Sequence, residues 1–286
     1  MKWLILVMLL LSGCSSAVYD NGNININFCP EDDCESQVAK LIASANESID
    51  CAFYSLSSDK IIKAIEESNV KKRFVFNKEI KYHKGLMHNK FCIIDESIVF
   101  TGSYNPNGLN YKNNIVIIES EHLAKNYLDE FNELYDYKFS KGAKVKYSKV
   151  YVDDVLIENY FCPDDKCDEK VKEILAASEE SVYFFIFSFT DHEIANILLS
   201  KNVHGLLESA QNSKWSVYPL FKDLDVELYT KGVMHNKVFV IDNKTVITGS
   251  WNPTKNGSEN NDENLLIIHS EEIAMKYVEK FLEYSQ

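Results

Sequence analysis

Two patterns of hydrophobic and polar residues alternate along this chain, one with helical spacing and one of short continuous apolar runs. They recur in the same order in each half. Apolar residues at helical spacing predict amphipathic helices at 35–46 and 168–178. Continuous apolar runs at 48–56 and 181–189 predict central strands of a sheet. Further matched pairs are predicted at 24–28 and 157–161, 58–68 and 190–200, 72–76 and 203–207, 115–118 and 265–268, and 121–136 and 270–284. Strands that alternate with helices indicate an α/β layered fold.

The repeat is clearest in one stretch of 23 residues. Lys84–Pro106 reads KGLMHNKFCIIDESIVFTGSYNP and Lys231–Pro253 reads KGVMHNKVFVIDNKTVITGSWNP, with 14 positions identical. Each copy predicts a β-hairpin. Residues 213–228 predict a further helix and strand that the first copy lacks. We therefore expect two similar units, related by a pseudo-twofold axis, around one shared site.

This repeat sets the expected organisation of the chain. We divide it into a leader at 1–13, a tether at 14–23, a first repeat at 24–140 (motif 82–108), a linker at 141–150 and a second repeat at 151–286 (motif 229–256). The two repeats count as one catalytic unit. A monomer should suffice, because both half-sites are on one chain.

Charge and composition exclude some functions. The 286 residues carry a formal net charge of −13, which argues against a protein that coats nucleic acid. Arg73 is the single arginine, so reading of base edges by bidentate arginine is improbable. A phosphate site built from a few lysines remains compatible with this composition.

The first residues predict export. Residues 3–11 form an apolar run that is too short to span a bilayer, which needs about 20 residues. This pattern is typical of a secretory signal. Leu11-Ser12-Gly13-Cys14 resembles the lipobox of bacterial lipoproteins, and the resemblance implies cleavage before Cys14, acylation of its thiol and anchoring outside the cytoplasm. The alternative is a plain signal peptide with a chance cysteine.

Four of the other cysteines form two close pairs, and outside the cytoplasm such pairs predict local disulfides. The pairs are Cys29 with Cys34 and Cys162 with Cys167. The alternative is a zinc site of four thiolates, which requires the two pairs to meet in space. Cys51 and Cys92 lie in apolar runs and are either core thiols or a third bridge.

The repeated motif supplies groups that suit a phosphoryl group. A histidine and a lysine two residues apart in a strand share one face, and a Gly-Ser-x-Asn segment comes after each hairpin. The residues are His88, Lys90, Ser103 and Asn105 in the first copy, and His235, Lys237, Ser250 and Asn252 in the second. Two such sets around one cleft would stabilise an oxyanion whose charge is spread over several oxygens.

These motifs resemble the paired HKD motifs of the phospholipase D superfamily. The resemblance covers His88-x-Lys90-x4-Asp95 and His235-x-Lys237-x4-Asp242, each succeeded by Gly-Ser-x-Asn. It implies a two-step phosphodiester exchange through a phosphohistidine, with the other histidine as general acid and then base. It implies no metal or other cofactor. It also implies that Asp95 and Asp242 satisfy backbone groups at turns, away from the cleft.

The two copies differ downstream of their motifs. Aligning the final strands places Glu263 opposite Asn113. In related enzymes a carboxylate at this position orients the histidine of the opposite half, and a carboxylate stabilises an imidazolium better than an amide does. We therefore predict that Glu263 orients His88, that His88 is the nucleophile and that His235 is the acid.

Three functions fit this chemistry. The first is a phospholipase D-type hydrolase that releases phosphatidate and an alcohol, which a lipid anchor would hold at a membrane. The second is an extracytoplasmic endonuclease acting on DNA or RNA, although the net charge of −13 would slow encounter with a polyanion. The third is a non-enzymatic envelope protein that kept the fold. A role like that of cardiolipin synthase is weaker, because no long apolar segment comes after the leader.

Overall fold

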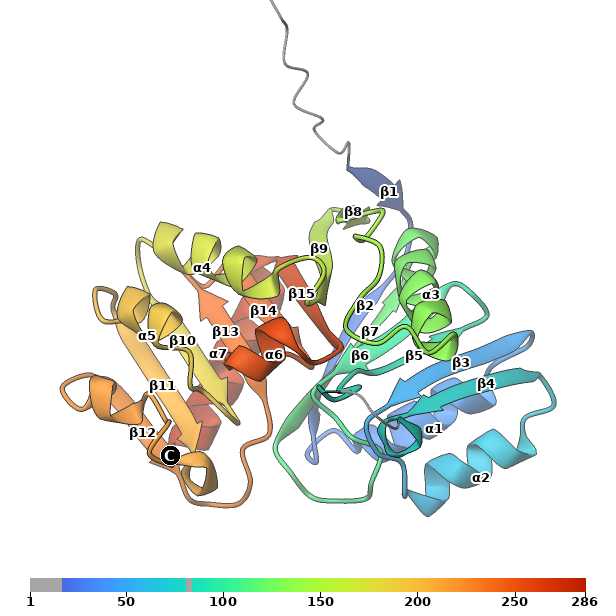
Figure 1. Ribbon diagram of the computed structural model, residues 1–286, viewed down its shortest axis with the longest axis horizontal. Helices are drawn as coiled ribbons and strands as arrows, with labels where there is room; N and C mark the ends of the chain where they lie inside the picture. Colours follow the sequence, from blue (N-terminus) through green and yellow to red (C-terminus); the bar gives the residue numbers. More distant parts are fainter. Residues whose placement is uncertain (1–16, 81–83) are drawn as a thin grey trace, which may run out of the picture.

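The computed structural model describes residues 17–80 and 84–286, and Figure 1 shows two α/β halves lying side by side. The leader at 1–13 and the lipidation site at Cys14 lie outside the described residues. Within the described part of the chain, no helix is long and apolar enough to span a membrane.

The first half is a six-stranded sheet in the order β2-β7-β6-β5-β3-β4. Its elements are β2 (Ile24–Cys29), α1 (Cys34–Ala43), β3 (Ser48–Phe53), α2 (Asp59–Glu67), β4 (Lys71–Phe76), β5 (Lys90–Ile94), β6 (Ile98–Gly102), β7 (Asn113–Glu119) and α3 (Glu121–Tyr135). β3 and β4 are parallel, whereas β5, β6 and β7 form an antiparallel meander.

The second half repeats this order inside a nine-stranded sheet, β1-β8-β9-β15-β14-β13-β10-β11-β12. The matched elements are β9 (Val155–Cys162), α4 (Cys167–Ala177), β10 (Val182–Ile186), α5 (His192–Leu198), β11 (Val203–Glu208), β13 (Lys237–Ile241), β14 (Thr245–Gly249), β15 (Glu263–His269) and α7 (Glu271–Ser285). The additional elements are β1 (Val18–Asp20), β8 (Lys149–Val152), β12 (Asp225–Tyr229) and α6 (Lys255–Glu259). The α/β fold of two similar repeats is confirmed.

The insertion in the second half is only partly as expected. Its strand is present as β12, which extends the sheet beyond β11. Its helix is reduced to a short 3-10 turn at Tyr218–Phe221, with Pro219 in the first turn. Proline fits the first turn of a helix but not its interior, so no helix can run through Pro219 from the N-terminal side.

A shared core joins the two halves. Alternate residues of each strand face opposite sides of the sheet, so Cys92 packs with α1 and α2, whereas Phe91 packs with α3. The core around α3 also contains α7 and strand residues of the second sheet, including Val238. The inner faces of both sheets and the helices α3 and α7 therefore bury one another, which fixes the halves relative to each other.

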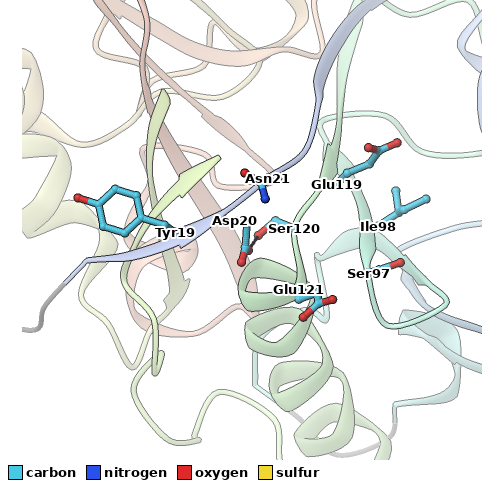
Figure 2. A pocket seen from close by; sticks show the side chains of 8 residues that line it. All are labelled: Tyr19, Asp20, Asn21, Ser97, Ile98, Glu119, Ser120 and Glu121. Atoms are coloured by element: carbon cyan, nitrogen blue, oxygen red, sulfur yellow. Dashed lines mark hydrogen bonds between the residues drawn. The ribbon is translucent and has the colours of Figure 1, made fainter. Parts of the chain in front are cut away.

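The N-terminal segment and the linker also cross between halves. The tether expected at 14–23 contains β1, which pairs in parallel with β8 of the second sheet. Figure 2 shows Asp20 directed at the first turn of α3, where it accepts hydrogen bonds from the Ser120 hydroxyl and from the His122 amide. β8 itself begins inside the expected linker at 141–150. Strands of three and four residues are too short to display an alternation of apolar and polar residues. Their pairing depends on tertiary contacts.

Three disulfides cross-link the structure. Cys29–Cys34 and Cys162–Cys167 close the predicted local loops, and Cys51–Cys92 joins β3 to β5 at directly opposed positions. Each short pair is bonded within its own half, which removes the zinc alternative. Of the two expectations for Cys51 and Cys92, core thiols or a bridge, the structure shows the bridge.

The aspartates of the two motifs lie at the hairpin turns. Asp95 accepts backbone N–H groups of residues 46–48, and Asp242 accepts those of residues 179–181. Both carboxylates therefore hold the loop that precedes the central strand of their own half. Their structural environment matches the expected role, although the turn that they bind is the neighbouring loop and not their own hairpin.

Candidate active site

The site is formed where the two halves are joined crosswise by their backbones. The His88 amide donates to the Asp262 carbonyl at 3.0 Å, and the Asp262 amide donates to the Leu86 carbonyl at 2.9 Å. The second half repeats this arrangement: the His235 amide donates to Lys112, and the Lys112 amide donates to Val233, both at 2.8 Å. Each histidine segment is therefore fixed by the start of the other half's last strand.

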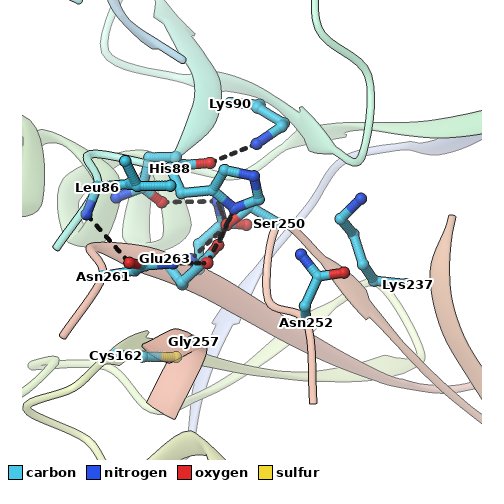
Figure 3. Close-up of polar contacts among 12 residues, drawn as sticks. Leu86, His88, Lys90, Cys162, Lys237, Ser250, Asn252, Gly257, Asn261 and Glu263 are labelled. Atoms are coloured by element: carbon cyan, nitrogen blue, oxygen red, sulfur yellow. Dashed lines mark hydrogen bonds and ion pairs between the residues drawn. The ribbon is translucent and has the colours of Figure 1, made fainter. Parts of the chain in front are cut away.

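This crossed pairing brings Glu263 against His88. The Nδ1 atom of His88 lies 2.8 Å from both carboxylate oxygens of Glu263, as Figure 3 shows. The carboxylate accepts two further hydrogen bonds, from the Ser250 hydroxyl at 2.6 Å and from the Asn261 side-chain amide at 3.0 Å. Glu263 is 0% exposed, so protein groups and not solvent compensate its charge.

His235 has neutral partners in the equivalent place. Its Nδ1 atom lies 2.8 Å from the amide oxygen of Asn113 and 3.1 Å from the Ser103 carbonyl. The Ser103 hydroxyl donates to the same Asn113 oxygen at 3.0 Å, just as Ser250 donates to Glu263. Ser103 and Ser250 therefore donate to the side chains that accept from the two histidines. The acceptor of His88 is an anionic carboxylate, whereas that of His235 is a neutral amide.

The lysines of both motifs and Asn252 lie close to the histidines. Lys90 and Lys237 each donate to the carbonyl of their own histidine at 2.5 Å and are at most 3% exposed. Figure 3 shows the side chains of Lys237 and Asn252 beside that of His88, although they come from the opposite half. Asn105 and Asn252 are 8% and 9% exposed. The arrangement gathers two amines and the Asn252 amide beside the histidines, and such donors suit an anion.

Burial shifts the protonation of these groups. Burial lowers the pKa of His88 to about 4, although the charge of Glu263 acts to raise it. Burial and the neighbouring Lys237 and Lys90 charges hold the pKa of His235 well below its usual value. Both imidazoles are therefore neutral at pH 7, with Nδ1–H donating to its acceptor and Nε2 left as the base.

The lysines respond to burial in the same direction. Burial lowers the pKa of Lys90 to about 7 and that of Lys237 well below its usual range. Glu263 has the opposite balance: burial opposes its ionisation, but His88 and Lys90 hold its pKa below the usual value. A bound phosphoryl anion would favour the charged form of both amines.

One aromatic ring packs against His88 and two pack against His235. Tyr54 comes directly after β3 and packs edge-on to His88, with ring centroids 5.2 Å apart. Phe187 comes directly after β10 and lies 4.8 Å from the His235 ring. Tyr111 also approaches His235, at 6.0 Å. Each lysine amine lies over the ring of its own half, Lys90 over Tyr54 and Lys237 over Phe187.

The structure brings together the histidines, the lysines, the serines, Asn252 and Glu263 that the sequence singled out, whereas the role of Asn105 stays a prediction. Asp95 and Asp242 lie away from them, at the hairpin turns. Sequence reasoning missed Asn261 as a donor to Glu263, and it noted Asn113 only as the counterpart of Glu263. The signal for Asn113 was the alignment of the two copies, whereas Asn261 has no signal short of the fold. No group of His, Cys, Asp or Glu among the described residues could hold a metal ion.

Comparison with known proteins defines the class. A family model described as cardiolipin synthase, PLD-like domain, matches residues 68–135 and 171–284. A phospholipase D of Rickettsia conorii (strain ATCC VR-613 / Malish 7) is 30% identical over 136 residues, which are 44% of this chain and 68% of that protein. The mitochondrial cardiolipin hydrolase of Canis lupus familiaris is 44% identical over 50 residues, 18% of this chain and 20% of that protein.

A solved structure shares the whole fold. The crystal structure of a phosphatidylserine synthase from Haemophilus influenzae Rd KW20 superposes with a TM-score of 0.69 at 12% identity, covering 91% of this chain and 85% of that one. The chain belongs to the phospholipase D superfamily. Within that superfamily it is a phosphodiesterase.

Proposed function

We propose that this protein hydrolyses phospholipids to phosphatidate and an alcohol through a phosphohistidine on His88, with His235 as the general acid and base. One observation carries the assignment of roles. Glu263 meets His88 at 2.8 Å, whereas His235 meets the amide oxygen of Asn113 at the same distance. A carboxylate stabilises the cationic phosphohistidine, and a neutral amide leaves a protonated His235 more acidic.

The first step forms one bond and breaks one. The Nε2 lone pair of neutral His88 attacks phosphorus, and the bond from phosphorus to the leaving alcohol oxygen breaks. His235, which takes up a proton beside the bound phosphate anion, gives that proton to the leaving oxygen. The Nδ1–H of His88 remains bonded to Glu263, so the positive charge on the ring develops against a buried carboxylate.

The second step reverses the role of His235. Its now neutral Nε2 accepts a proton from water, whose oxygen attacks phosphorus while the bond to His88 Nε2 breaks. Lys90, Lys237, Asn105 and Asn252 offer donors to the non-bridging oxygens in both steps. The phosphate ester leaves with the new oxygen, His88 returns neutral and His235 is ready for another turnover.

Several features favour a lipid at a membrane. The similar proteins of Rickettsia and dog are named phospholipase D and cardiolipin hydrolase. The three disulfides are typical of a protein outside the cytoplasm. A lipidated Cys14 would hold the cleft close to phospholipid, and both half-sites on one chain allow a monomer to act.

Trapping the intermediate tests the assignment of the histidines. We expect His235→Asn protein, given phosphatidyl-p-nitrophenol with a labelled acyl chain, to release p-nitrophenol once and keep the label, because this phenol leaves without an acid and water then lacks its base. His88→Asn protein should keep no label. Label on His88→Asn but not on His235→Asn protein would reverse the roles.

Substrate assays test the lipid assignment. The full chain, with EDTA present, is given phosphatidylcholine or phosphatidylethanolamine vesicles and, separately, single- and double-stranded DNA and RNA. Release of choline or ethanolamine, absent in His88→Asn protein, is the expected result. Cleavage of DNA or RNA without lipid turnover would replace the proposal with a nuclease. A folded protein inactive on every substrate would favour the non-enzymatic alternative.

A further inference from the structure

Glu208 is a buried acid that the proposed mechanism does not use. It is the last residue of β11 and is 3% exposed. One carboxylate oxygen accepts the Met234 amide at 2.6 Å, and the other accepts the Ala210 amide at 2.9 Å and lies 3.4 Å from the Ser209 hydroxyl. These donors are neutral, although an acid is rarely buried so deeply without a charged partner. The carboxylate joins the end of β11 to the residue directly before His235.

Asn77 occupies the equivalent place in the first half. The strand register aligns it with Glu208, because in each half the preceding residue pairs with the central-strand residue that faces the motif lysine. The side-chain oxygen of Asn77 accepts the Met87 amide at 3.0 Å, just as Glu208 accepts the amide of Met234. The contact is therefore repeated in both halves, but the acceptor is a neutral amide in the first and a carboxylate in the second.

The backbone before His235 is held from two directions. The Met234 amide donates to Glu208 of its own half, whereas the next amide, that of His235, donates to the Lys112 carbonyl of the other half at 2.8 Å. Met234 itself is 0% exposed and belongs to the core that the halves share. Loss of the Glu208 acceptor would leave a buried N–H without a partner, and the segment would shift to satisfy it.

A carboxylate suits this place better than an amide does. Each oxygen of Glu208 accepts a different backbone amide, whereas a glutamine side chain would turn its NH2 group toward one of these N–H donors. A hydrogen bond to an ionised acceptor is also shorter and stronger than one to a neutral acceptor. The two distances follow this order, with 2.6 Å to Glu208 and 3.0 Å to Asn77. The segment before His235 therefore has the stronger hold.

We propose that Glu208 is a positioning residue for His235, because its hold on the Met234 amide keeps the imidazole within reach of the leaving oxygen. That reach is about 2.6–3.2 Å between heavy atoms, so a small shift of the segment disables an acid or a base. Asn77 positions His88 in the same way. The roles of the histidines as acid and nucleophile rest on the proposed function, whereas the positioning of each histidine from its own half does not.

Two leaving groups separate a displaced acid from a displaced nucleophile. The measurement is kcat/KM for bis(p-nitrophenyl) phosphate, from which p-nitrophenolate leaves without an acid, and for diphenyl phosphate, whose more basic phenolate needs a proton. This constant reports the steps up to release of the first alcohol. A displaced His235 therefore slows the diphenyl ester alone, whereas a displaced His88 slows both esters. The ratio of the two losses does not depend on how much of a variant is folded.

The variants are Glu208→Gln, which keeps the size of the side chain but not its second acceptor, and Asn77→Ala, which removes the acceptor of the other half. Glu227→Gln is the matched control, because Glu227 is exposed and lies on the neighbouring strand β12. We expect Glu208→Gln to lower kcat/KM about tenfold for diphenyl phosphate and at most about twofold for bis(p-nitrophenyl) phosphate. Asn77→Ala should lower both values to the same degree, and Glu227→Gln should behave like the unchanged protein.

The outcomes separate the positioning from the proposed function. Equal losses on both esters in Glu208→Gln, with no selectivity in Asn77→Ala, would overturn the positioning. Selectivity for the diphenyl ester in Asn77→Ala alone would exchange the roles of the histidines and still support positioning from the same half. Neither ester is a lipid, so the result is independent of the lipid assignment. If Glu208→Gln does not fold, Glu208→Asp takes its place and should show the same selectivity, because it keeps the charge on a shorter side chain.

Discussion

The two halves of the molecule have nearly the same fold, yet they hold their histidines by different chemistry. In the first half His88 faces the buried carboxylate of Glu263, whereas in the second half His235 faces the amide oxygen of Asn113. Even the sheet cores differ: the Cys51–Cys92 bridge takes the place of the facing rings Phe184 and Phe239. A duplicated unit can therefore keep its geometry while its two copies take different roles.

The largest effect is expected when the two groups that orient the histidines are made alike. Glu263→Gln should lower kcat by about 10³-fold, because the cationic intermediate on His88 loses its buried counter-charge. Asn113→Ala should cost about tenfold, because the Ser103 carbonyl still accepts from His235. Single-turnover kinetics with a lipid substrate measure both. Equal losses would mean that the carboxylate gives His88 no special role.

The next largest expected effect is on the free energy of unfolding, and it comes from the disulfide between β3 and β5. Removing it with Cys51→Ala and Cys92→Ala should lower the free energy of unfolding by about 4 kcal/mol, since the bond closes a loop with a sequence separation of 41. Cys29→Ala with Cys34→Ala, which opens a loop with a separation of 5, should cost about 2 kcal/mol. Urea denaturation under non-reducing conditions compares them, and an equal cost for both pairs would contradict the loop-length argument.

The smallest effect concerns a feature that the halves share. Burial acts to raise the pKa of Asp95 and of Asp242, but the backbone amides that they accept lower it below the usual value. Both carboxylates therefore add stability that is present above pH 3.8 and is lost as pH falls below it. Asp95→Asn and Asp242→Asn should each cost about 1 kcal/mol at pH 7, allowing for solvent screening.

The control for this prediction is the same measurement at low pH. At pH values below the ordinary Asp pKa of 3.8, both variants should approach the stability of the unchanged protein, because the aspartates of that protein are then increasingly protonated. A clear difference between the two variants at pH 7 would show that the halves diverge at the hairpin turns as well. Thermal unfolding at neutral and at acidic pH provides the comparison.

Most elements of the fold could be predicted because their patterns are local. The apolar strands 48–56 and 181–189 and the helices after them have periods that sequence alone displays. β1 and β8 could not be predicted, since three or four residues carry no period and their pairing exists only between the halves. The insertion was half predicted: its strand has apolar alternation, but Pro219 prevents a helix from starting well before it, and only a short 3-10 turn forms.

Residue identities at repeated spacing establish the duplication, the two His-Lys-Asn sets and the unequal pair of Glu263 and Asn113. The folded structure adds contacts that no spacing displays: the Ser103 carbonyl lies against His235, and Asn261 and the two serines donate to the acceptors behind the histidines. The reason is that these contacts join residues far apart in the chain, and burial sets their charges. No spacing within one copy records which groups the other copy places against it.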